Sequence, residues 1–224
     1  MMRTDLAALL PALDGESQAA YAYRLLELRI VGLDLKPGQA ITEGQLCAEL
    51  GLGRTPVREA LQRLVQVWLV RVLPRRGMIV TDIDLNEQMR VIEARRTIEH
   101  QVVRLATARA TPAQRTAFAQ FGQRFDALLV ERDEMSLGRV DSEFNELTFE
   151  AAGNKFMTAA LGAMHAVTRR YWYVQSLRAD IYPTTVRLHA QLAHAIASGK
   201  EDEAAGLNDA LLDFCEQYTR ASLS

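Results

Sequence analysis

The first helical pattern of hydrophobic residues lies in Thr42–Leu50. Leu46 and Leu50 are four residues apart, so both fall on one face of a helix. Gly51 follows at once, and glycine readily takes the left-handed conformation that ends many helices. The pattern predicts a short amphipathic helix that ends in a tight turn.

A second helix is predicted directly after this turn. Pro56 suits the first turn of a helix, because its missing N–H would have no partner there. Apolar residues then recur at helical spacing: Val57, Leu61, Leu64 and Val65. Two β-rich runs come next, at residues 68–73 and 78–81, joined by Pro74-Arg75-Arg76-Gly77. Two helices followed by a hairpin predict a winged helix-turn-helix.

Residues 83–224 show helical patterns and no convincing strand. Start signals occur at Asp84-Leu-Asn-Glu87 and Thr111-Pro112, and a stop signal occurs at Gly153-Asn154. We expect about six helices, near residues 84–110, from 111 onward, 136–152, 155–178, 183–198 and 201–221. The predicted fold class is therefore mainly α: an N-terminal winged helix-turn-helix and a C-terminal all-helical bundle.

Length and composition fit two domains, which we place at residues 1–82 and 83–224. The chain has 224 residues, of which 49% are hydrophobic. No apolar run approaches the roughly 20 residues of a membrane span, and the N-terminus lacks the order of a signal peptide. We therefore expect a cytoplasmic protein with no membrane partner. Cys47 and Cys215 are too few and too far apart for a disulfide framework.

Positive charge is concentrated in the second helix and the hairpin. Between residues 54 and 76 six arginines accompany a single acid, Glu59, although the formal net charge of the chain is −2. Such a focus favours binding to nucleic acid phosphates over the alternative of a merely structural hairpin, because counterion release depends on the contact face. The residues expected to contact DNA are Arg54, Thr55, Pro56, Arg58, Arg75, Arg76 and Gly77.

Four motifs lie between about Tyr21 and Val80. They are Leu35-Lys-Pro-Gly38, Leu46-Cys-Ala-Glu-Leu-Gly51, Arg54-Thr-Pro-Val-Arg-Glu-Ala-Leu61 and Pro74-Arg-Arg-Gly77. With them this region resembles the N-terminal domain of GntR-family transcriptional regulators. The resemblance implies a homodimer that binds double-stranded operator DNA. Two positions depart from the family: Gly53 stands where a helix-capping serine is usual, and Trp68 stands where a glycine is usual.

Motifs in the predicted bundle carry a second resemblance. They are Arg95-Arg-Thr-Ile-Glu99, Asp141-Ser-Glu-Phe-Asn145, Ala151-Ala-Gly-Asn154 and the segment from Leu188-His189 to Gly199. They resemble the C-terminal ligand-binding (FCD) domain of the FadR-type subfamily. The resemblance implies a small carboxylate effector inside the bundle, in many members beside a divalent metal such as zinc or nickel.

The metal ligands that this resemblance implies are only partly present. Asp141 matches the family's aspartate and His189 one of its histidines, but Asn145 replaces another histidine and a third position falls near Leu211. Imidazole-rich metal sites have three or four protein ligands. Asp141, Asn145 and His189 therefore form an incomplete metal site at most, and we favour the interpretation that they hydrogen-bond the effector.

Arginine side chains are candidate clamps for the effector carboxylate, because a guanidinium group pairs with a carboxylate through two parallel hydrogen bonds. Arg95 and Arg170 complete the set of residues expected to bind the effector. The alternative interpretation is that each is an ordinary solvent-exposed arginine. The neighbouring Tyr171-Trp-Tyr173 cluster fits either a pocket wall or ordinary packing.

Together these features predict a DNA-binding transcriptional regulator and not an enzyme, since neither a nucleophile–base set nor a phosphate-binding loop is evident. We expect a repressor whose operator affinity is controlled by a small carboxylate metabolite bound in the helical bundle. Two alternatives remain open: a ligand-independent architectural DNA-binding protein and a metal-dependent sensor.

Overall fold

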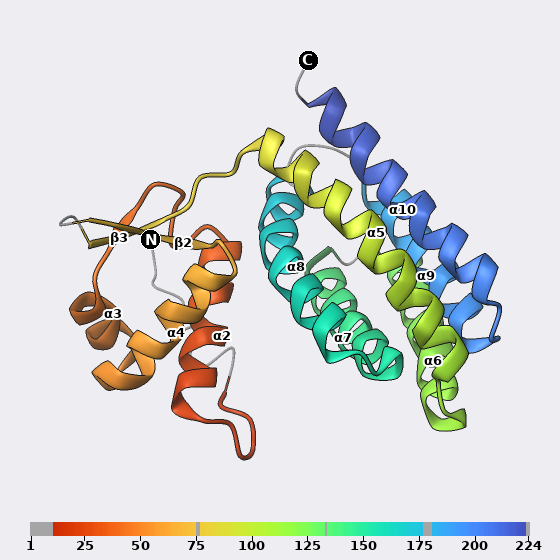
Figure 1. Ribbon diagram of the computed structural model, residues 1–224, viewed down its shortest axis with the longest axis horizontal. Coiled ribbons are helices and arrows are strands. Elements are labelled where there is room, and N and C mark those ends of the chain that lie inside the picture. The colour runs from red at the N-terminus through yellow and green to blue at the C-terminus, as the bar shows by residue number, and fades with distance from the viewer. Residues whose placement is uncertain (1–10, 75–76, 133, 177–180, 223–224) are drawn as a thin grey trace. The chain divides into compact units, whose positions relative to one another are not determined.

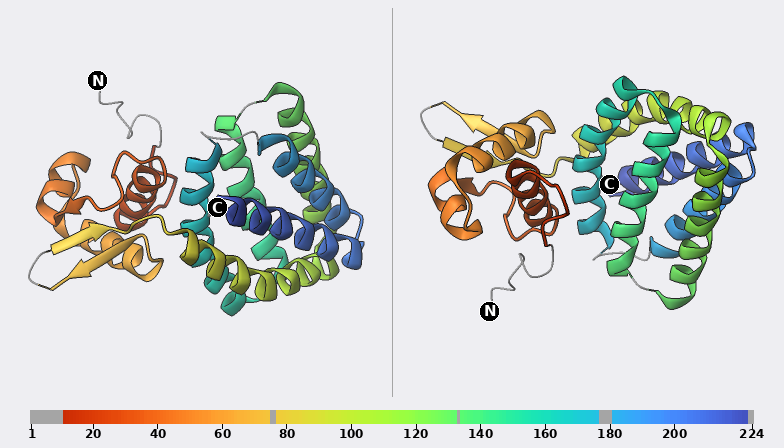
Figure 2. Two further views of the ribbon diagram at one scale, coloured as in Figure 1. Left: turned by 90° about the horizontal axis from the view of Figure 1, so that it is seen from above. Right: turned by 90° about the horizontal axis from the view of Figure 1, so that it is seen from below.

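The computed structural model describes residues 11–74, 77–132, 134–176 and 181–222. It divides into two compact units (Figures 1 and 2). Unit 1 comprises Met1–Ile83 together with His165–Tyr173, and unit 2 comprises Asp84–Met164 together with Val174–Ser224. The central part of one late helix thus packs with the N-terminal segment.

Unit 1 is a small helical domain with a β-hairpin. Its elements are α2 (Gln18–Val31), β1 (Ala40–Ile41), α3 (Glu43–Leu50), α4 (Arg54–Gln66), β2 (Val70–Leu73) and β3 (Gly77–Val80). The strands form an antiparallel sheet in the order β1-β3-β2, with Val70 opposite Val80. This arrangement confirms the predicted winged helix-turn-helix. Helix α2 and strand β1 were not predicted from the sequence pattern.

Local signals explain where α3 and α4 begin and end. The Thr42 hydroxyl accepts a hydrogen bond from the Gln45 N–H at 3.3 Å, which caps α3. Gly51 then ends α3 at a φ of 66°, in the left-handed region where a side chain would be strained. Gly53 occupies the N-cap of α4 and provides no side-chain hydrogen bond there. The turn between the two helices is therefore short and rich in glycine.

The core of unit 1 joins its helices to the hairpin. Its fully buried members include Leu26, Ile30, Leu46, Val57, Leu61, Leu64, Val70 and Val80, with Ala166 from the late helix. On α4 the buried residues lie on one face, as the helical spacing predicted. The opposite face of α4 is consequently exposed.

Unit 2 is built from helices. They are α5 (Leu85–Arg109), α6 (Pro112–Glu131), α7 (Glu134–Ala152), α8 (Lys155–Ser176), α9 (Tyr182–Ala197) and α10 (Glu201–Ala221), with the middle of α8 assigned to unit 1 (Figure 1). The structure therefore confirms the predicted helical bundle within the ranges it describes. Asp84 caps α5, and Thr111 and Gln114 form a reciprocal capping box at the start of α6.

Two antiparallel helix pairs hold unit 2 together. α6 and α9 approach closely at Gly122, where an added Cβ atom would lie only 2.4 Å from the His194 ring. Polar side-chain pairs join α5 to α10: Arg96 with Asp213 at 2.7 Å and His100 with Asp209 at 3.0 Å. These pairs fix which residues of α5 and α10 lie at the same level, which matters for the site inside the bundle.

Candidate DNA-binding face and effector site

The leading end of α4 presents polar side chains to solvent. Arg54, Thr55 and Arg58 are exposed, and Pro56 is half-buried. All four belong to the first turns of the helix, whose apolar face is turned into the core of unit 1. The helix thus offers two guanidinium groups and a hydroxyl at the end that enters a major groove in helix-turn-helix proteins.

Arg58 is held in place by a residue of the preceding helix. Its Nε and Nη2 groups donate to the two carboxylate oxygens of Glu43 at 3.0 and 2.9 Å. The hydrogen bonds from Arg58 keep the pKa of the Glu43 carboxyl below its usual value. Sequence reasoning missed this pair, because Glu43 lies at the start of α3 and is fifteen residues away.

Other basic residues of this region have different surroundings. The Arg63 guanidinium lies over the Tyr23 ring, 4.2 Å from its centroid, and so is occupied by α2. In the β2–β3 hairpin, which is the wing of the winged helix-turn-helix, Gly77 begins β3 at a φ of 87°. Arg75 and Arg76, both predicted to contact DNA, lie outside the described residues.

Trp68 has a backbone conformation that explains why glycine is usual at this position. Its φ is 58°, in the left-handed region that costs a residue with a Cβ about 1–2 kcal/mol. Its side chain is 56% exposed, and its carbonyl accepts a hydrogen bond from the Thr81 hydroxyl at 2.7 Å. The turn into the hairpin therefore carries strain that the tryptophan does not relieve by burial.

Inside unit 2 the structure brings together three of the predicted effector-site residues. The His189 Nε2–H group donates to the Asp141 carboxylate at 3.0 Å, and the Asn145 amide donates to the same carboxylate at 3.1 Å. His189 Nδ1 lies 2.8 Å from the Thr185 carbonyl oxygen. The ring also packs against Phe125, with centroids 5.2 Å apart. Helices α7 and α9 together form this cluster.

Arg95 joins the same interior through a buried ion pair on α5. Its Nε and Nη2 groups donate to the Glu99 carboxylate at 2.8 and 3.1 Å. Both residues are only 6% exposed. Burial alone would lower the pKa of the Arg95 guanidinium, but the charge and hydrogen bonds of Glu99 raise it, with further contributions from Cys215 and Asp141. The two ion pairs therefore form one electrostatic cluster.

The charge state of His189 follows from its surroundings. Burial alone would lower its pKa, but the hydrogen bond and charge of Asp141 outweigh burial, and the Thr185 carbonyl and Glu99 charge add to them. The pKa of His189 is consequently raised. Burial also raises the pKa of the neighbouring Cys215 thiol to about 12, which keeps this thiol neutral.

These residues do not fit a divalent metal. Both His189 ring nitrogens face oxygen acceptors, so both carry hydrogen and neither offers a lone pair to a metal. The Asn145 amide directs its N–H group at Asp141. Within the residues that the structure describes, no three His, Cys, Asp or Glu side chains are grouped as metal ligands. In the described structure Asp141, Asn145 and His189 thus form a hydrogen-bonded group.

Arg170, the other arginine of the predicted effector set, has a different environment. Arg170 belongs to unit 1, where its guanidinium donates to the carbonyl oxygens of Thr81 at 2.7 Å and Asp82 at 2.9 Å. Only 2% of the residue is exposed. Its guanidinium is thus engaged with the backbone that follows β3.

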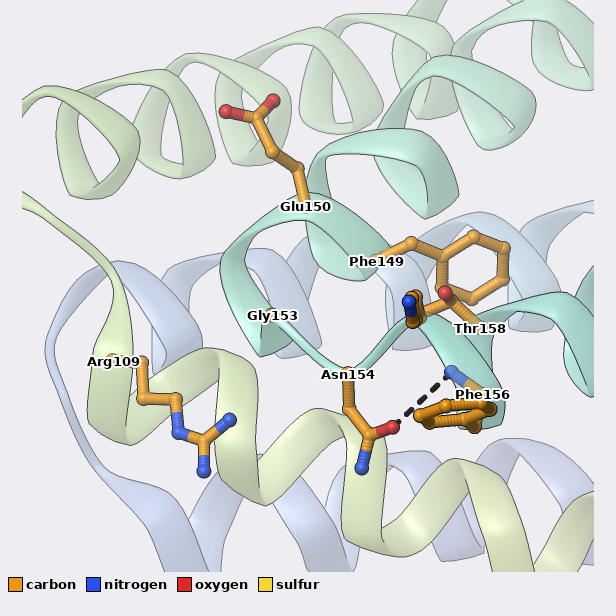
Figure 3. A pocket seen from close by; sticks show the side chains of 8 residues that line it. Arg109, Phe149, Glu150, Gly153, Asn154, Phe156 and Thr158 are labelled. Carbon is orange, nitrogen blue, oxygen red and sulfur yellow. Dashed lines mark hydrogen bonds between the residues drawn. The ribbon is translucent and has the colours of Figure 1, made fainter.

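A surface hollow of about 770 Å³ lies elsewhere in unit 2, at the turn between α7 and α8 (Figure 3). Arg109, Glu150, Asn154 and Phe156 are among the residues that line it. The Asn154 side chain accepts a hydrogen bond from the Phe156 N–H at 3.2 Å and so caps α8. The hollow includes none of the predicted effector residues, and its polar groups serve the turn.

Comparison with known proteins agrees with both parts of the structure. The family model described as "Bacterial regulatory proteins, gntR family" matches residues 18–80, and the FCD domain model matches residues 90–214. The two matches cover the winged helix-turn-helix and most of the helical bundle.

Individual relatives span most of the chain. The Nta operon transcriptional regulator of Aminobacter aminovorans is 27% identical over 178 residues, which cover 78% of this chain and 81% of that protein. The HTH-type transcriptional repressor RspR of Escherichia coli K12 is 24% identical over 175 residues, covering 78% and 76%. The solved structure of E. coli McbR/YncC has a TM-score of 0.76 at 17% identity, covers 93% of this chain and 100% of its own, and shows a shared fold.

The fold and these matches define a DNA-binding transcriptional regulator and not an enzyme. More narrowly, the chain belongs to the GntR family and carries an FCD effector-binding domain. A search of the described helices for membrane spans found none that is both long and apolar enough.

Proposed function

We propose that this protein is a repressor that binds operator DNA as a homodimer and leaves it when a small carboxylate binds inside unit 2. The observation that carries the DNA-binding part is the exposed end of α4, where Arg54, Thr55 and Arg58 stand free of the core. Two copies of this helix would read the two half-sites of a palindromic operator.

Charge and geometry support the assignment of α4 as the helix that contacts DNA. Arg58 is oriented by Glu43 through hydrogen bonds from Nε and Nη2, and a guanidinium fixed in this way can direct its remaining N–H groups at a base edge or a phosphate. Arg63 lies further along the same helix but is stacked on Tyr23. The first turns of α4, rather than its whole length, therefore form the proposed contact.

Operator binding by arginine variants tests this proposal. An operator is first recovered by selection from random-sequence duplexes, and affinity is then measured by fluorescence anisotropy at fixed salt. Arg54→Ala with Arg58→Ala should weaken binding by at least about 30-fold, since each specific contact is worth about 1–3 kcal/mol. Arg63→Ala is the matched control, because it removes the same charge from the same helix. Equal losses in the double variant and the control would contradict the proposed contact.

The effector part rests on the buried charges of unit 2. Arg95 supports this part, because its guanidinium group is buried and a carboxylate is the natural bidentate partner of such a group. The Asp141 side chain is 26% exposed, so the cluster has a side open to solvent. A ligand bound there can act on DNA affinity only through its different affinity for the two states of the protein.

A thermal-shift screen of small carboxylates with the full-length protein tests the effector part. A binding carboxylate should raise the melting temperature and weaken operator binding. A carboxylate that stabilises the protein and leaves operator affinity unchanged would contradict control by the effector. The architectural alternative would be favoured if no small molecule affected either measurement.

A further inference from the structure

The wing is tied to the end of α4 at Thr81, the residue that follows β3. The Thr81 N–H donates to the Leu69 carbonyl oxygen at 3.0 Å, and the Thr81 hydroxyl donates to the Trp68 carbonyl oxygen at 2.7 Å. Trp68 and Leu69 lie between the end of α4 and the start of β2. Thr81 therefore joins the end of the hairpin to the turn that follows the proposed DNA-contacting helix.

A residue from much later in the chain holds Thr81. Arg170 of α8 donates from Nη1 to the Thr81 carbonyl oxygen at 2.7 Å. Its Nη2 group donates to the Asp82 carbonyl oxygen at 2.9 Å and to the Thr81 hydroxyl oxygen at 3.1 Å. Hydrogen bonds from a charged donor are stronger than neutral ones, and consecutive bonds polarise one another in a buried setting. Arg170, Thr81 and Trp68 thus form one chain of hydrogen bonds.

The part of α8 that carries Arg170 is built into unit 1. Ala166 is fully buried in the core of this unit, and Val167 packs against that core. Arg169 forms an ion pair with Glu27 of α2. The gntR family model matches residues 18–80, whereas this segment falls within the FCD match at residues 90–214. The DNA-binding unit therefore includes a segment that lies outside the GntR match.

The turn at Trp68 needs support from its surroundings. Its φ of 58° lies in the left-handed region, which disfavours any residue with a Cβ atom. Strained backbone of this kind persists where neighbouring contacts over-determine it. The Trp68 side chain is 56% exposed, so its burial does not supply that support, but the hydrogen bond to its carbonyl oxygen does. The chain from Arg170 thus ends at the strained residue.

We propose that Arg170 is a positioning residue for DNA binding. It acts through Thr81, which fixes the turn at Trp68 and with it the placement of the wing relative to α4. A winged helix contacts a duplex at two places at once, so its helix and its wing must be held in one arrangement. The inference rests on the proposed DNA contact of α4 and the wing, and adds a residue of α8 on which this contact depends.

Two variants of the full-length protein break the chain at different links. Arg170→Gln removes the guanidinium, and Thr81→Val keeps the charge and nearly the shape but removes the bridging hydroxyl. Each should weaken binding to the selected operator roughly three- to tenfold in anisotropy titrations, the range that a single hydrogen bond contributes. The double variant should lose no more than Arg170→Gln alone, because both changes interrupt one chain. Losses that multiply in the double variant would overturn the chain.

Trp68 itself reports on the turn. The sequence contains two tryptophans, so Trp172→Phe leaves Trp68 as the single indole. Trp172 packs edge-to-face on Tyr171, a contact that phenylalanine can retain. In this background Arg170→Gln and Thr81→Val should each increase the fast local motion of the Trp68 ring, measured by time-resolved fluorescence anisotropy, while circular dichroism shows that the protein stays folded.

Two controls in unit 2 separate positioning from general effects. Arg124→Gln removes a partly exposed positive charge, and Phe118→Leu weakens the core of that unit without changing charge. Neither should change the Trp68 signal or the operator affinity of the folded protein. If Arg170→Gln resembled Phe118→Leu, with a lower melting temperature but unchanged operator affinity and Trp68 motion, Arg170 would serve stability alone and the proposal would be overturned.

The two proposals fail in different ways. Loss of operator binding when Arg54 and Arg58 are replaced, together with full binding by Arg170→Gln, would overturn only the positioning role. Full binding when Arg54 and Arg58 are replaced would instead overturn the proposed contact by α4.

Discussion

The α4 arginines and the interior cluster use the same kind of charged group in opposite settings. Arg54 and Arg58 are exposed, whereas Arg95 is buried with Glu99 and coupled to a second ion pair. An exposed guanidinium can exchange water and counterions for a phosphate at little cost, but a buried charge must be matched locally. The first setting suits contact with a large polyanion, whereas in the second each charge is held by a neighbouring side chain.

Because one set of arginines is exposed and the other is buried, mutations should affect the two regions differently. Loss of an exposed arginine removes a contact and leaves the fold intact, because water replaces it. Loss of one member of a buried pair leaves the other charged and unpaired. Variants of the α4 face should therefore change DNA affinity at constant stability, and variants of the cluster should change stability first.

The largest expected effect is on stability, in the Arg95–Glu99 pair. Arg95→Leu should lower the free energy of unfolding by about 3–5 kcal/mol, because Glu99 would remain buried without its partner. Adding Glu99→Leu should recover most of this loss. Urea denaturation of both variants measures it. If the double variant were as unstable as the sum of two independent losses, the pair would not be coupled as described.

His189 offers a pH test of the second pair. Its pKa is raised in the folded protein, so its stabilising contribution is fully present below the unfolded value of 6.5 and is lost as pH rises through the folded value. The charged groups that act on it are Asp141 and Glu99. Relative to His189→Gln, the wild-type protein should therefore be most stabilised at mildly acidic pH, as measured by urea denaturation across pH. A stability difference that grew with pH would mean that the histidine is neutral.

Trp68 tests the strained turn that leads into the wing. Trp68→Gly should be more stable than Trp68→Ala by about 1 kcal/mol, because only glycine adopts a φ of 58° without a Cβ penalty. Comparing these two variants cancels the loss of the indole ring. Thermal denaturation gives the difference, and equal stability would show that the turn relaxes.

The smallest effect is expected at Glu43, on the exposed side of the comparison. Glu43→Gln removes a negative charge that pairs with Arg58, so affinity for non-specific duplex should rise roughly two- to fivefold. Because Arg58 would also lose its orientation, the ratio of operator to non-specific affinity should fall. Glu93→Gln in unit 2 makes the same charge change as a control. Anisotropy titrations with both duplexes separate the two outcomes, and unchanged discrimination would rule out a positioning role.

Local pattern was sufficient for α4 and for the helices of unit 2. Helical spacing, the glycine turn and the capping residues are all short-range signals, and the structure follows them. The partner of Arg95 is likewise one helical turn away on α5. What the pattern could not give is the register between helices, which decides that His189 meets Asp141 and that His100 meets Asp209.

The same limit applies to the hydrogen-bond partners of Arg170. Its place on α8 is clear from sequence, but its partners at Thr81 and Asp82 are almost ninety residues earlier in the chain. Trp68 shows a related limit, because a family glycine signals a left-handed residue only once the backbone angle is known. Long-range packing, rather than local propensity, set both outcomes.

The most direct test of the whole account is the affinity for the selected operator with and without the small carboxylate that most stabilises the protein. Anisotropy titrations of the full-length protein should show operator binding weakened about 5- to 150-fold at saturating carboxylate, the usual range of coupling between two sites. At the same concentration, a carboxylate that does not stabilise the protein should leave operator affinity unchanged. Equal operator affinities for the wild-type protein with and without saturating ligand would contradict a switch that joins the two regions.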